Sequence, residues 1–157
     1  MNIEFSTEVN MTNMTDALSM IKTVWDEVPF CKKGQIKFKP DVQHFVNLMN
    51  SGILFLITAR DISKNNEVVA VYASIIAPNM FNTEIKTSHT IGWGVKKVYR
   101  SKGLTKMLLD QIETTLVANK IHMWNLVLPK KEEPTSTEKL LTTMGYELVE
   151  STYMRYV

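Results

Sequence analysis

Cysteine is nearly absent from this sequence. Cys31 is the only one among 157 residues, so no disulfide can form within the chain. Proteins of oxidising compartments commonly depend on disulfides, so the composition fits a reducing compartment, and we expect a cytoplasmic protein. Residues 1–5 contain neither a basic segment nor a long apolar run, which argues against a secretory signal. Because no stretch approaches the ~20 apolar residues of a membrane-spanning helix, we expect no membrane partner.

Metal-ligand and nucleotide-binding patterns are lacking as well. The three histidines, His44, His89 and His122, lie far apart and form no ligand spacing with Cys31, so no metal site is expected. The spacing G-x-G-x-x-G of dinucleotide-binding proteins is missing, and so is the G-K-S/T ending of a Walker loop. The formal net charge is only +2, which is too small to indicate nucleic acid as the main partner.

What remains is the composition of an ordinary globular domain. Hydrophobic residues make up 45% of the chain and charged residues 22%, and no internal repeat or linker is evident. A chain of this length can bury a sizeable core, so we expect residues 1–157 to form a single domain.

Hydrophobic periodicity predicts an alternation of strands and helices. Strands are predicted at residues 3–9, 53–59, 68–76, 88–96 and 122–128, with a closing antiparallel pair at 146–150 and 152–157. Helices are predicted from Thr12 or Thr15 to just before Pro29, and at residues 40–51, 104–120 and 135–144. The order β-α-α-β-β-β-α-β-α-β-β indicates an α/β protein with a mixed central sheet. The fifth strand follows a helix, so it should lie parallel to the fourth through a right-handed crossover.

The most informative stretch is a basic bend between the predicted fourth strand and third helix. Backbone N–H groups in the first turn of a helix have no intrahelical partner, and the helix dipole favours negative charge there. Gly103 allows the backbone to approach a phosphate closely, because it has no Cβ. Three cations surround it, Arg100, Lys102 and Lys106. The pattern therefore predicts a site for a small ligand with linked phosphates.

The six residues of this bend, Arg100-Ser101-Lys102-Gly103-Leu104-Thr105, resemble the acetyl-CoA-binding motif Q/R-x-x-G-x-G/A of the GNAT superfamily of N-acetyltransferases. Thr105 departs from the family pattern, which ends on glycine or alanine. The predicted order of elements also matches the GNAT fold over essentially the whole chain. The resemblance implies a single-domain GNAT-type fold in which the parallel fourth and fifth strands splay apart.

The same resemblance implies acetyl-CoA as the acyl donor. Its pantetheine arm and acetyl group would contact the main chain of Trp93 and Val95 in the gap between the splayed strands. Asn125, on the fifth strand, would hydrogen-bond the cofactor or the substrate. The pyrophosphate would be held by the residues of the bend, which are Arg100, Ser101, Lys102, Gly103, Leu104 and Thr105.

A general base is needed, because only a neutral amine attacks a thioester. His89 is the first candidate. The two-residue alternation of a strand puts it on the same side as Ile91, Trp93 and Val95, and family members often place a base, usually a glutamate, in this part of the fourth strand. An ordinary histidine pKa near 6.5 suits proton removal near neutrality. Glu84, in the preceding loop, is the second candidate.

The acid that would protonate the leaving thiolate is harder to find. Many GNAT members place a tyrosine four residues before the glycine that ends the last helix, and here that position is Leu141, which cannot donate a proton. Tyr146 and Tyr153 are nearby in the sequence. Two functions therefore stay open. The first is an N-acetyltransferase that moves an acetyl group from acetyl-CoA to a primary amine of a small molecule or protein. The second, favoured by Leu141 and Thr105, is a catalytically degenerate CoA-binding or regulatory module.

The pocket for the acceptor would be lined by three loops of mixed charge, at residues 30–39, 79–88 and 129–134. The second loop contains Glu84, which slightly favours a cationic acceptor. An acyl group other than acetyl is compatible with the same residues. The family often dimerises through its closing strands, so a homodimer is an expected partner.

Overall fold

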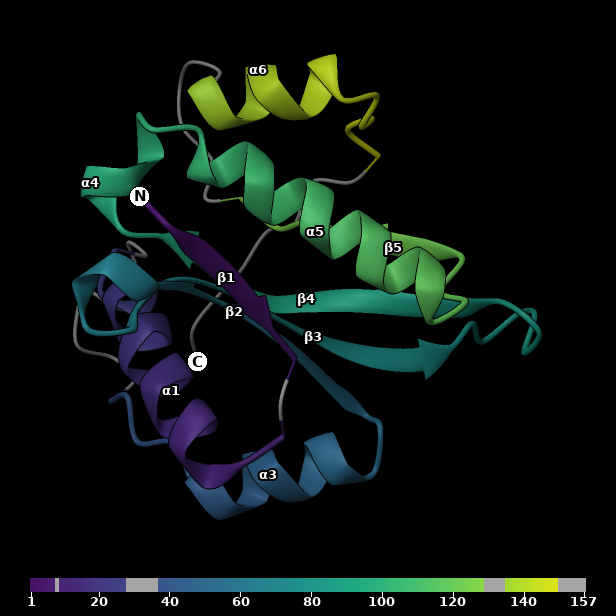
Figure 1. Cartoon of the computed structure of the whole chain (residues 1–157). Helices are drawn as coiled ribbons and strands as arrows, with labels where there is room; N and C mark the ends of the chain where they lie inside the picture. The colour runs from purple at the N-terminus through teal and green to yellow at the C-terminus, as the bar shows by residue number, and fades with distance from the viewer. Residues whose placement is uncertain (8, 28–36, 129–134, 150–157) are drawn as a thin grey trace.

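Five strands of the chain form one mixed sheet. The computed structural model describes residues 1–7, 9–27, 37–128 and 135–149. Within these residues the strands follow the sequence order β1-β2-β3-β4-β5 (Figure 1). The pairs β1–β2, β2–β3 and β3–β4 are antiparallel, and β5 is parallel to β4. This confirms the predicted α/β class and the parallel fourth and fifth strands. The bounds are β1 Ile3–Ser6, β2 Leu54–Asp61, β3 Glu67–Pro78, β4 Lys86–Val95 and β5 Met123–Asn125.

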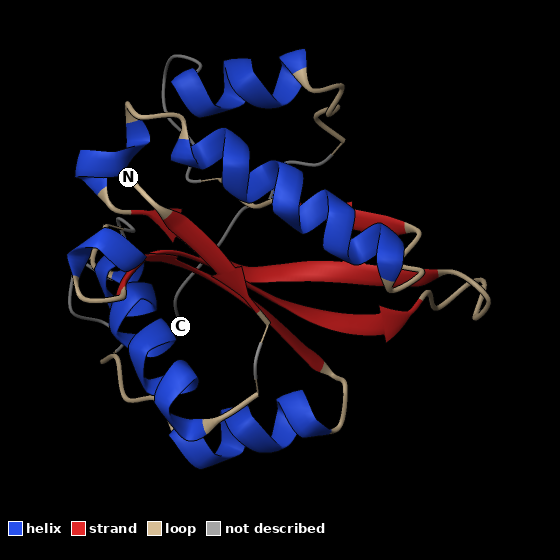
Figure 2. Cartoon of the chain, in the orientation of Figure 1, coloured by secondary structure: helices blue, strands red, loops and turns tan. Residues whose placement is uncertain are grey.

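Helices cover both faces of this sheet (Figure 2). On one face, α1 (Met11–Trp25) and α3 (Val42–Asn50) pack against β2 and β3 in one hydrophobic cluster. On the other face, α5 (Leu104–Ala118) forms a second cluster, to which α6 (Ser136–Thr143) contributes Leu141. Two shorter elements complete the described chain, the 3-10 turn η1 (Ile62–Lys64) and the single-turn helix α4 (Lys97–Arg100).

Strand β3 lies at the centre of both clusters. Every residue from 68 to 74 is buried. Val69 and Tyr72 belong to the cluster under α5, whereas Val71 and Ala73 belong to the cluster under α1 and α3. A strand that is covered on both faces has no solvent side, so its sequence shows a continuous apolar run.

Helix ends follow the expected chemistry, although one cap differs from the prediction. Asn10 caps α1, and its side chain accepts a hydrogen bond of 2.7 Å from the N–H of Asn13. The alternatives from sequence, Thr12 and Thr15, lie inside this helix, so that prediction is wrong. Asparagine and threonine can both accept this bond, so the residue type alone does not distinguish Asn10 from the two threonines. At α6, Thr135 forms the expected cap together with Glu138.

Three strand predictions differ from the structure. The strand predicted at residues 3–9 ends at Ser6. The segment 122–128 pairs with β4 over only three residues, because its later apolar residues Leu126 and Leu128 pack onto the cluster under α5 instead of joining a ladder. Residues 146–149 are not a strand, and Leu148 is exposed. The last predicted strand, together with Cys31, Tyr153 and the loop segments 30–36 and 129–134, lies outside the described residues.

Within the described residues, no helix combines the length and the apolarity that crossing a bilayer requires.

Candidate functional site

The parallel strands β4 and β5 part from each other after three residue pairs. The pairs are Thr87 with Met123, Ser88 with Trp124, and His89 with Asn125. Beyond this point β4 continues for six residues to Val95, whereas β5 ends at Asn125. The predicted splay is therefore confirmed, and we call the point where pairing ends the strand junction (residues 87–90 of β4 and Asn125).

A β-bulge marks the same position. On β3, Ser74 pairs with Thr90 and the adjacent Ala73 pairs with Gly92, so Ile91 is an extra residue in β4. Past the bulge, the N–H of Lys96 donates to the carbonyl of Val69 on β3.

That bond fixes the direction of the free backbone groups. Successive residues of a strand direct their N–H and C=O groups to opposite edges. Because Lys96 faces β3, the backbone groups of Trp93 and Val95 face away from β3, towards the gap that β5 leaves open. The carbonyl of Val95 accepts a hydrogen bond of 2.7 Å from Nε of Arg100. Among the described residues, no strand pairs with β4 along this edge, on which the sequence places the acyl arm, although the Val95 carbonyl is occupied by Arg100.

The bulge also corrects the predicted face of His89. His89 pairs with Ile75, which packs in the cluster under α1 and α3, whereas Trp93 pairs with Tyr72 in the cluster under α5. Paired residues of an antiparallel ladder lie on the same face. His89 therefore lies on the opposite face of the sheet from Trp93 and Val95. The two-residue alternation of side chains fails here because the bulge at Ile91 adds one residue to β4.

Two side-chain features shape the gap. The indole Nε1–H of Trp93 donates to the carbonyl of Val127 at 3.1 Å, so this side chain spans from β4 to the segment after β5. On the other face, a Cβ built on Gly94 would lie 2.3 Å from Cγ2 of Val24 in α1. Gly94 is thus explained by helix packing. No atom lies within 4 Å of the corresponding position at Gly92.

Four polar side chains meet at the strand junction. Nε2 of His89 lies 3.0 Å from Oγ1 of Thr87, and Nδ1 of His89 lies 3.3 Å from Nδ2 of Asn125. Oδ1 of Asn125 accepts from the N–H of Thr90 at 3.1 Å, and the hydroxyl of Thr90 donates to the carbonyl of Asn125. The side chain of Asn125 thus takes up the backbone donor with which the ladder would otherwise continue. Within this network His89 is exposed, whereas Thr87 is buried.

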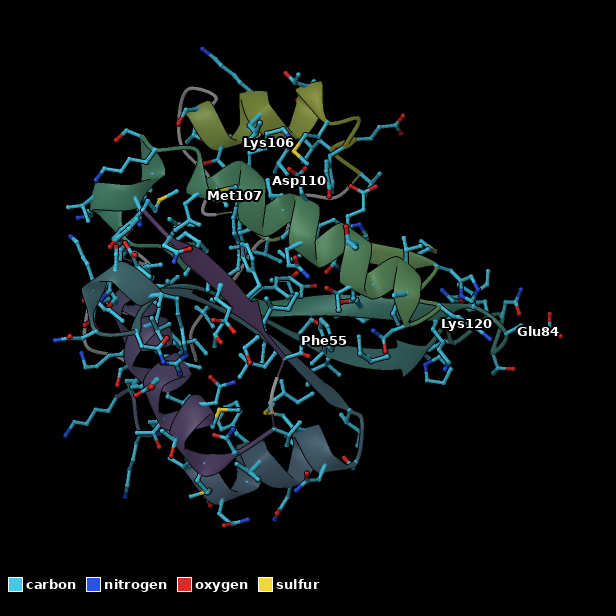
Figure 3. All side chains as sticks on the ribbon, viewed as in Figure 1. Phe55, Glu84, Lys106, Met107, Asp110 and Lys120 are labelled. Atoms are coloured by element: carbon cyan, nitrogen blue, oxygen red, sulfur yellow. The ribbon has the colours of Figure 1, made fainter. Side chains whose placement is uncertain are left out.

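Glu84 does not join this network. It lies in the turn between β3 and β4, where its N–H donates to Oδ1 of Asn82 at 3.1 Å. Figure 3 shows it at the outer end of that turn, near Lys120 and away from the sheet. The structure therefore brings His89 and Asn125 together and leaves the second base candidate apart from them. His122 has a structural contact, because its Nδ1 accepts from the N–H of Lys86 at 3.0 Å.

The basic bend leads directly into a helix, as the sequence predicts. Gly103 has φ +81°, a left-handed conformation, and immediately precedes α5. Among the described residues, no side chain caps this helix, and apart from its chain neighbours no atom lies within 4 Å of a Cβ built on Gly103. The first N–H groups of α5, from Leu104 and Thr105, therefore have neither an intrahelical partner nor a side-chain cap. This geometry fits a phosphate group at the start of α5. The preceding turn α4 was not predicted.

A buried anchor holds the bend in place. The hydroxyl of Tyr99, in α4, donates to Oδ2 of Asp61 at the end of β2 at 3.0 Å, and both side chains are buried. Oδ1 of Asp61 accepts from the hydroxyl and the N–H of Ser63, and from the N–H of Asn2. The Ser63 hydroxyl and the Tyr99 hydroxyl, in that order, lower the pKa of Asp61 to about 2, against the opposing effect of burial. Burial and Asp61 raise the pKa of Tyr99.

The cations of the bend are already engaged with other groups. Nη2 of Arg100 lies 3.1 Å from each carboxylate oxygen of Glu27, so its guanidinium faces the end of α1. Lys106 forms an ion pair with Asp110 one turn further along α5 (Figure 3). The Nζ of Lys102 lies 5.5 Å from the centroid of the Tyr99 ring. Among the described residues, Ser101 and Thr105 take part in no ion pair; Ser101 is exposed, and Thr105 is half-buried in the first turn of α5.

No proton donor for a leaving thiolate emerges among the described residues. Leu141 is buried in the cluster under α5. The ring of Tyr146 packs against Trp124 with centroids 5.2 Å apart, and its hydroxyl is closed off from solvent. Burial raises the pKa of this hydroxyl. Among the described residues, no group of three or more His, Cys, Asp or Glu side chains is placed to hold a metal ion.

Sequence reasoning missed Thr87, Thr90 and Asp61. The two threonines matter only because β4 and β5 meet, and Asp61 matters only because α4 returns to the end of β2. No local pattern signals such contacts, although Asp61 before Ser63 is a typical turn signal.

Comparison with known proteins places the fold. No protein-family model and no curated protein sequence matches the chain. Solved structures do match over nearly the full length of both chains. An aminoglycoside acetyltransferase from an uncultured soil metagenomic sample has a TM-score of 0.78 at 13% identity and covers 100% of this chain and 99% of its own. A predicted acetyltransferase from Clostridium acetobutylicum, solved with acetyl-CoA, has a TM-score of 0.67 at 15% identity, with coverages of 98% and 96%.

A transcriptional regulator from Bacillus halodurans is also similar, with a TM-score of 0.73 at 14% identity and coverages of 99% and 100%. These likenesses confirm the predicted GNAT-type fold. At such identities they show the fold and leave the activity to the residues of the site.

Proposed function

We propose that the chain is an N-acetyltransferase that transfers an acetyl group from acetyl-CoA to a primary amine. The observation that carries this proposal is the early end of the β4–β5 pairing, which leaves the backbone edge of Trp93 and Val95 open. Gly103, in a left-handed conformation directly before α5, leaves the start of that helix without a side-chain cap. A neighbour in fold that was solved with acetyl-CoA supports the choice of donor.

The donor would be held mainly by backbone groups. The N–H groups of Leu104 and Thr105 would bind the pyrophosphate, and the open edge of β4 would bind the pantetheine arm. Lys102 would add positive charge, together with the hydroxyls of Ser101 and Thr105. Arg100 would act through its backbone, because its guanidinium is bound to Glu27 and Val95. Asn125 and Trp93 would border the acetyl group.

His89 would take the proton of the attacking amine. The amine nitrogen forms a bond to the thioester carbonyl carbon, the carbon–sulfur bond breaks, and the sulfur leaves as a thiolate. A thiol has an ordinary pKa near 8.5, so its thiolate is a weak enough base to leave without a dedicated acid. This accounts for a working site in which Leu141 stands where relatives carry tyrosine. Glu84 would serve the acceptor, as an exposed carboxylate that attracts a cationic amine.

The acceptor is proposed to be a cationic primary amine of a small molecule or protein. The aminoglycoside acetyltransferase of similar fold supports a polyamine-like acceptor. A cytoplasmic location and a homodimer through the closing strands also stay predictions. The low cysteine content supports the former, and the latter falls on residues outside the described ones.

Calorimetric titration with acetyl-CoA tests the first half of the proposal, and injection of acetyl-CoA into buffer without protein is the blank. Binding with a Kd in the micromolar range is expected, and no heat at high micromolar ligand would contradict it. A panel of amines, including aminoglycosides, polyamines and N-terminal peptides, then tests transfer through the release of free thiol. Thiol release that depends on both substrates supports an enzyme.

A second function has its own support. Leu141 offers no acid, Thr105 departs from the motif, and one similar structure is a transcriptional regulator. A CoA-binding module without catalysis would bind acetyl-CoA in the titration and release no thiol with any amine of the panel.

A further inference from the structure

The strand junction fixes more about His89 than its place on β4. We infer that Thr87 and Asn125 are positioning residues that hold His89 in one tautomer, with the proton on Nε2 and the lone pair of Nδ1 directed at the junction. The catalytic meaning of this inference rests on the proposed function. The tautomer itself follows from hydrogen-bond chemistry alone.

Thr87 determines the state of Nε2. A hydroxyl has a single proton to donate. The hydroxyl of Thr87 donates that proton to the carbonyl of Ala77 at 3.0 Å. Towards Nε2 of His89, which lies 3.0 Å away, it can therefore only accept. The donor of this bond must be an N–H on Nε2.

Asn125 determines the state of Nδ1 independently. A backbone N–H can only donate, so the side-chain atom of Asn125 that faces the N–H of Thr90 must be its oxygen. The amide nitrogen then faces Nδ1 of His89 and can only donate. Nδ1 must accept, so it has no proton. Both neighbours give the same answer, the neutral ring protonated on Nε2.

The two bonds differ in strength, and this has a consequence for chemistry. The bond from Asn125 to Nδ1 measures 3.3 Å, longer than the usual 2.9–3.0 Å for a nitrogen donor. An incoming amine or water can therefore displace it at little cost. Nδ1 lies beside the last pair of the β4–β5 ladder, where the gap begins. It is the nitrogen that would receive the proton of the acceptor amine, while Thr87 keeps the other nitrogen occupied.

The chain contains an internal reference for this arrangement. Nδ1 of His122 accepts the backbone N–H of Lys86 at 3.0 Å, so His122 also has its proton on Nε2 when neutral. The tautomer of His122 depends on the backbone N–H of Lys86 and not on Asn125 or Thr87. His44 is exposed on α3, and within the described residues its ring accepts no backbone N–H. Its nitrogen signals should therefore be averaged between the two tautomers.

Nitrogen NMR of the full chain with 15N-labelled imidazoles tests the inference at about pH 8, above the ordinary histidine pKa. Signals are assigned with His89→Gln and His122→Gln. For His89 we expect a pyrrole-type Nε2 and a pyridine-type Nδ1, as for His122. A pyrrole-type Nδ1, or values averaged between the two tautomers, would overturn the inference.

The variant Asn125→Asp changes one atom at the ring and keeps the acceptor for Thr90. A carboxylate oxygen in place of the amide nitrogen can only accept, so Nδ1 of His89 should become protonated while His122 is unchanged. A His89 spectrum unaffected by Asn125→Asp would contradict the role of Asn125. Thr87→Val should release Nε2 and move the His89 signals partway towards the averaged values, because only the long bond from Asn125 then selects the tautomer, and Thr87→Ser should restore them. If Thr87→Val fails to fold, Thr87→Ser still tests the inference, because it keeps the hydroxyl. Its His89 nitrogen signals should equal those of the wild-type chain, and different signals would contradict the role of Thr87.

Turnover gives a separate readout. Asn125→Asp should lower kcat about tenfold to hundredfold at saturating acetyl-CoA, and the Kd for acetyl-CoA measured on the same protein separates this loss from any effect of Asn125 on cofactor binding. If the wild-type chain shows the expected tautomer but no turnover with any amine, the proposed function fails and the inference about His89 stands. If turnover is present and Asn125→Asp leaves kcat unchanged, the positioning role is wrong and the proposed function stands.

Discussion

The strand junction and the basic bend lie at the two ends of the same gap, yet they are built in different ways. The bend comes from contiguous residues, with Gly103 in a left-handed conformation directly before α5. The junction joins His89 and Asn125, which are 36 positions apart in the sequence. The bend offers backbone N–H groups, whereas the junction offers a titratable side chain. This difference matches the proposed division of labour, in which the bend would bind the donor and the junction would act on the acceptor.

The largest effect is expected at the junction. His89→Gln should lower kcat by about 100- to 10,000-fold, because it removes the general base, and should leave the Kd for acetyl-CoA within a factor of three. His44→Gln, an exposed substitution on α3, is the matched control. Steady-state kinetics and calorimetry on the same preparations check both halves. A weaker acetyl-CoA complex in His89→Gln with normal kcat would erase the contrast between the two ends.

Gly94 lies between the two ends and should affect stability. A Cβ there would lie 2.3 Å from Val24, so Gly94→Ala should lower the free energy of unfolding by about 1–3 kcal/mol through overpacking. Adding Val24→Ala removes the clashing methyl group and should recover part of this loss. Urea unfolding of the single and double variants measures the coupling. Strictly additive losses would mean that α1 does not press on β4 at this point.

Substitutions in the bend should weaken acetyl-CoA binding and leave the chemical step unaffected. Gly103→Ala forces a left-handed conformation on a residue with a Cβ, which costs about 1–2 kcal/mol, and displaces the first N–H groups of α5. The Kd for acetyl-CoA should rise by about tenfold or more.

Gly52→Ala is the matched control for this variant. Gly52 has φ +72° and also has no atom within 4 Å of its Cβ position, but it follows α3, away from the gap. It should show a similar loss of stability with no change in acetyl-CoA affinity. Equal changes of affinity in both variants would show that strain alone, and not the position of Gly103, governs binding.

The smallest effect concerns the anchor of the bend under acid. The folded-state pKa of Asp61 is about 2 and its ordinary value is 3.8, so its contribution to stability is complete above about pH 4 and is lost as pH falls through 2. Asp61→Asn should remove this part of the pH dependence and lower stability at neutral pH, because Asn2, Ser63 and Tyr99 lose a charged acceptor.

Urea unfolding at several pH values between 2 and 6 measures the slope for Asp61→Asn. Asp110→Asn is the control, since Asp110 makes an exposed ion pair worth at most about 1 kcal/mol. A wild-type slope retained in Asp61→Asn would assign the acid sensitivity to other carboxyl groups.

The same contrast explains what the sequence could predict. The bend at Gly103, the helix after it and the apolar strand β3 follow from local patterns of glycine and apolar residues, and the structure confirms them. The order of elements follows from hydrophobic periodicity, and the splay from the resemblance to the GNAT family.

The features that escaped prediction depend on contacts between distant segments. Ile91 becomes a bulge only when β3 and β4 pair, and this reverses the face of His89. The role of Asn125 beside Thr90 exists only where the β4–β5 ladder stops. The end of β5 was overestimated because Leu126 and Leu128 satisfy an apolar pattern through helix packing and not through strand pairing.

If the gap between β4 and β5, with the bend at its end, receives acetyl-CoA as proposed, binding should change the surroundings of the backbone amides there. The most direct measurement is a titration of the 15N-labelled chain with acetyl-CoA, followed through its backbone amide signals. The account predicts large shifts at Trp93, Val95, Gly103, Leu104 and Thr105, and little change along β1 (Ile3–Ser6). Saturable shifts confined to other parts of the chain, with these five amides unmoved, would contradict it.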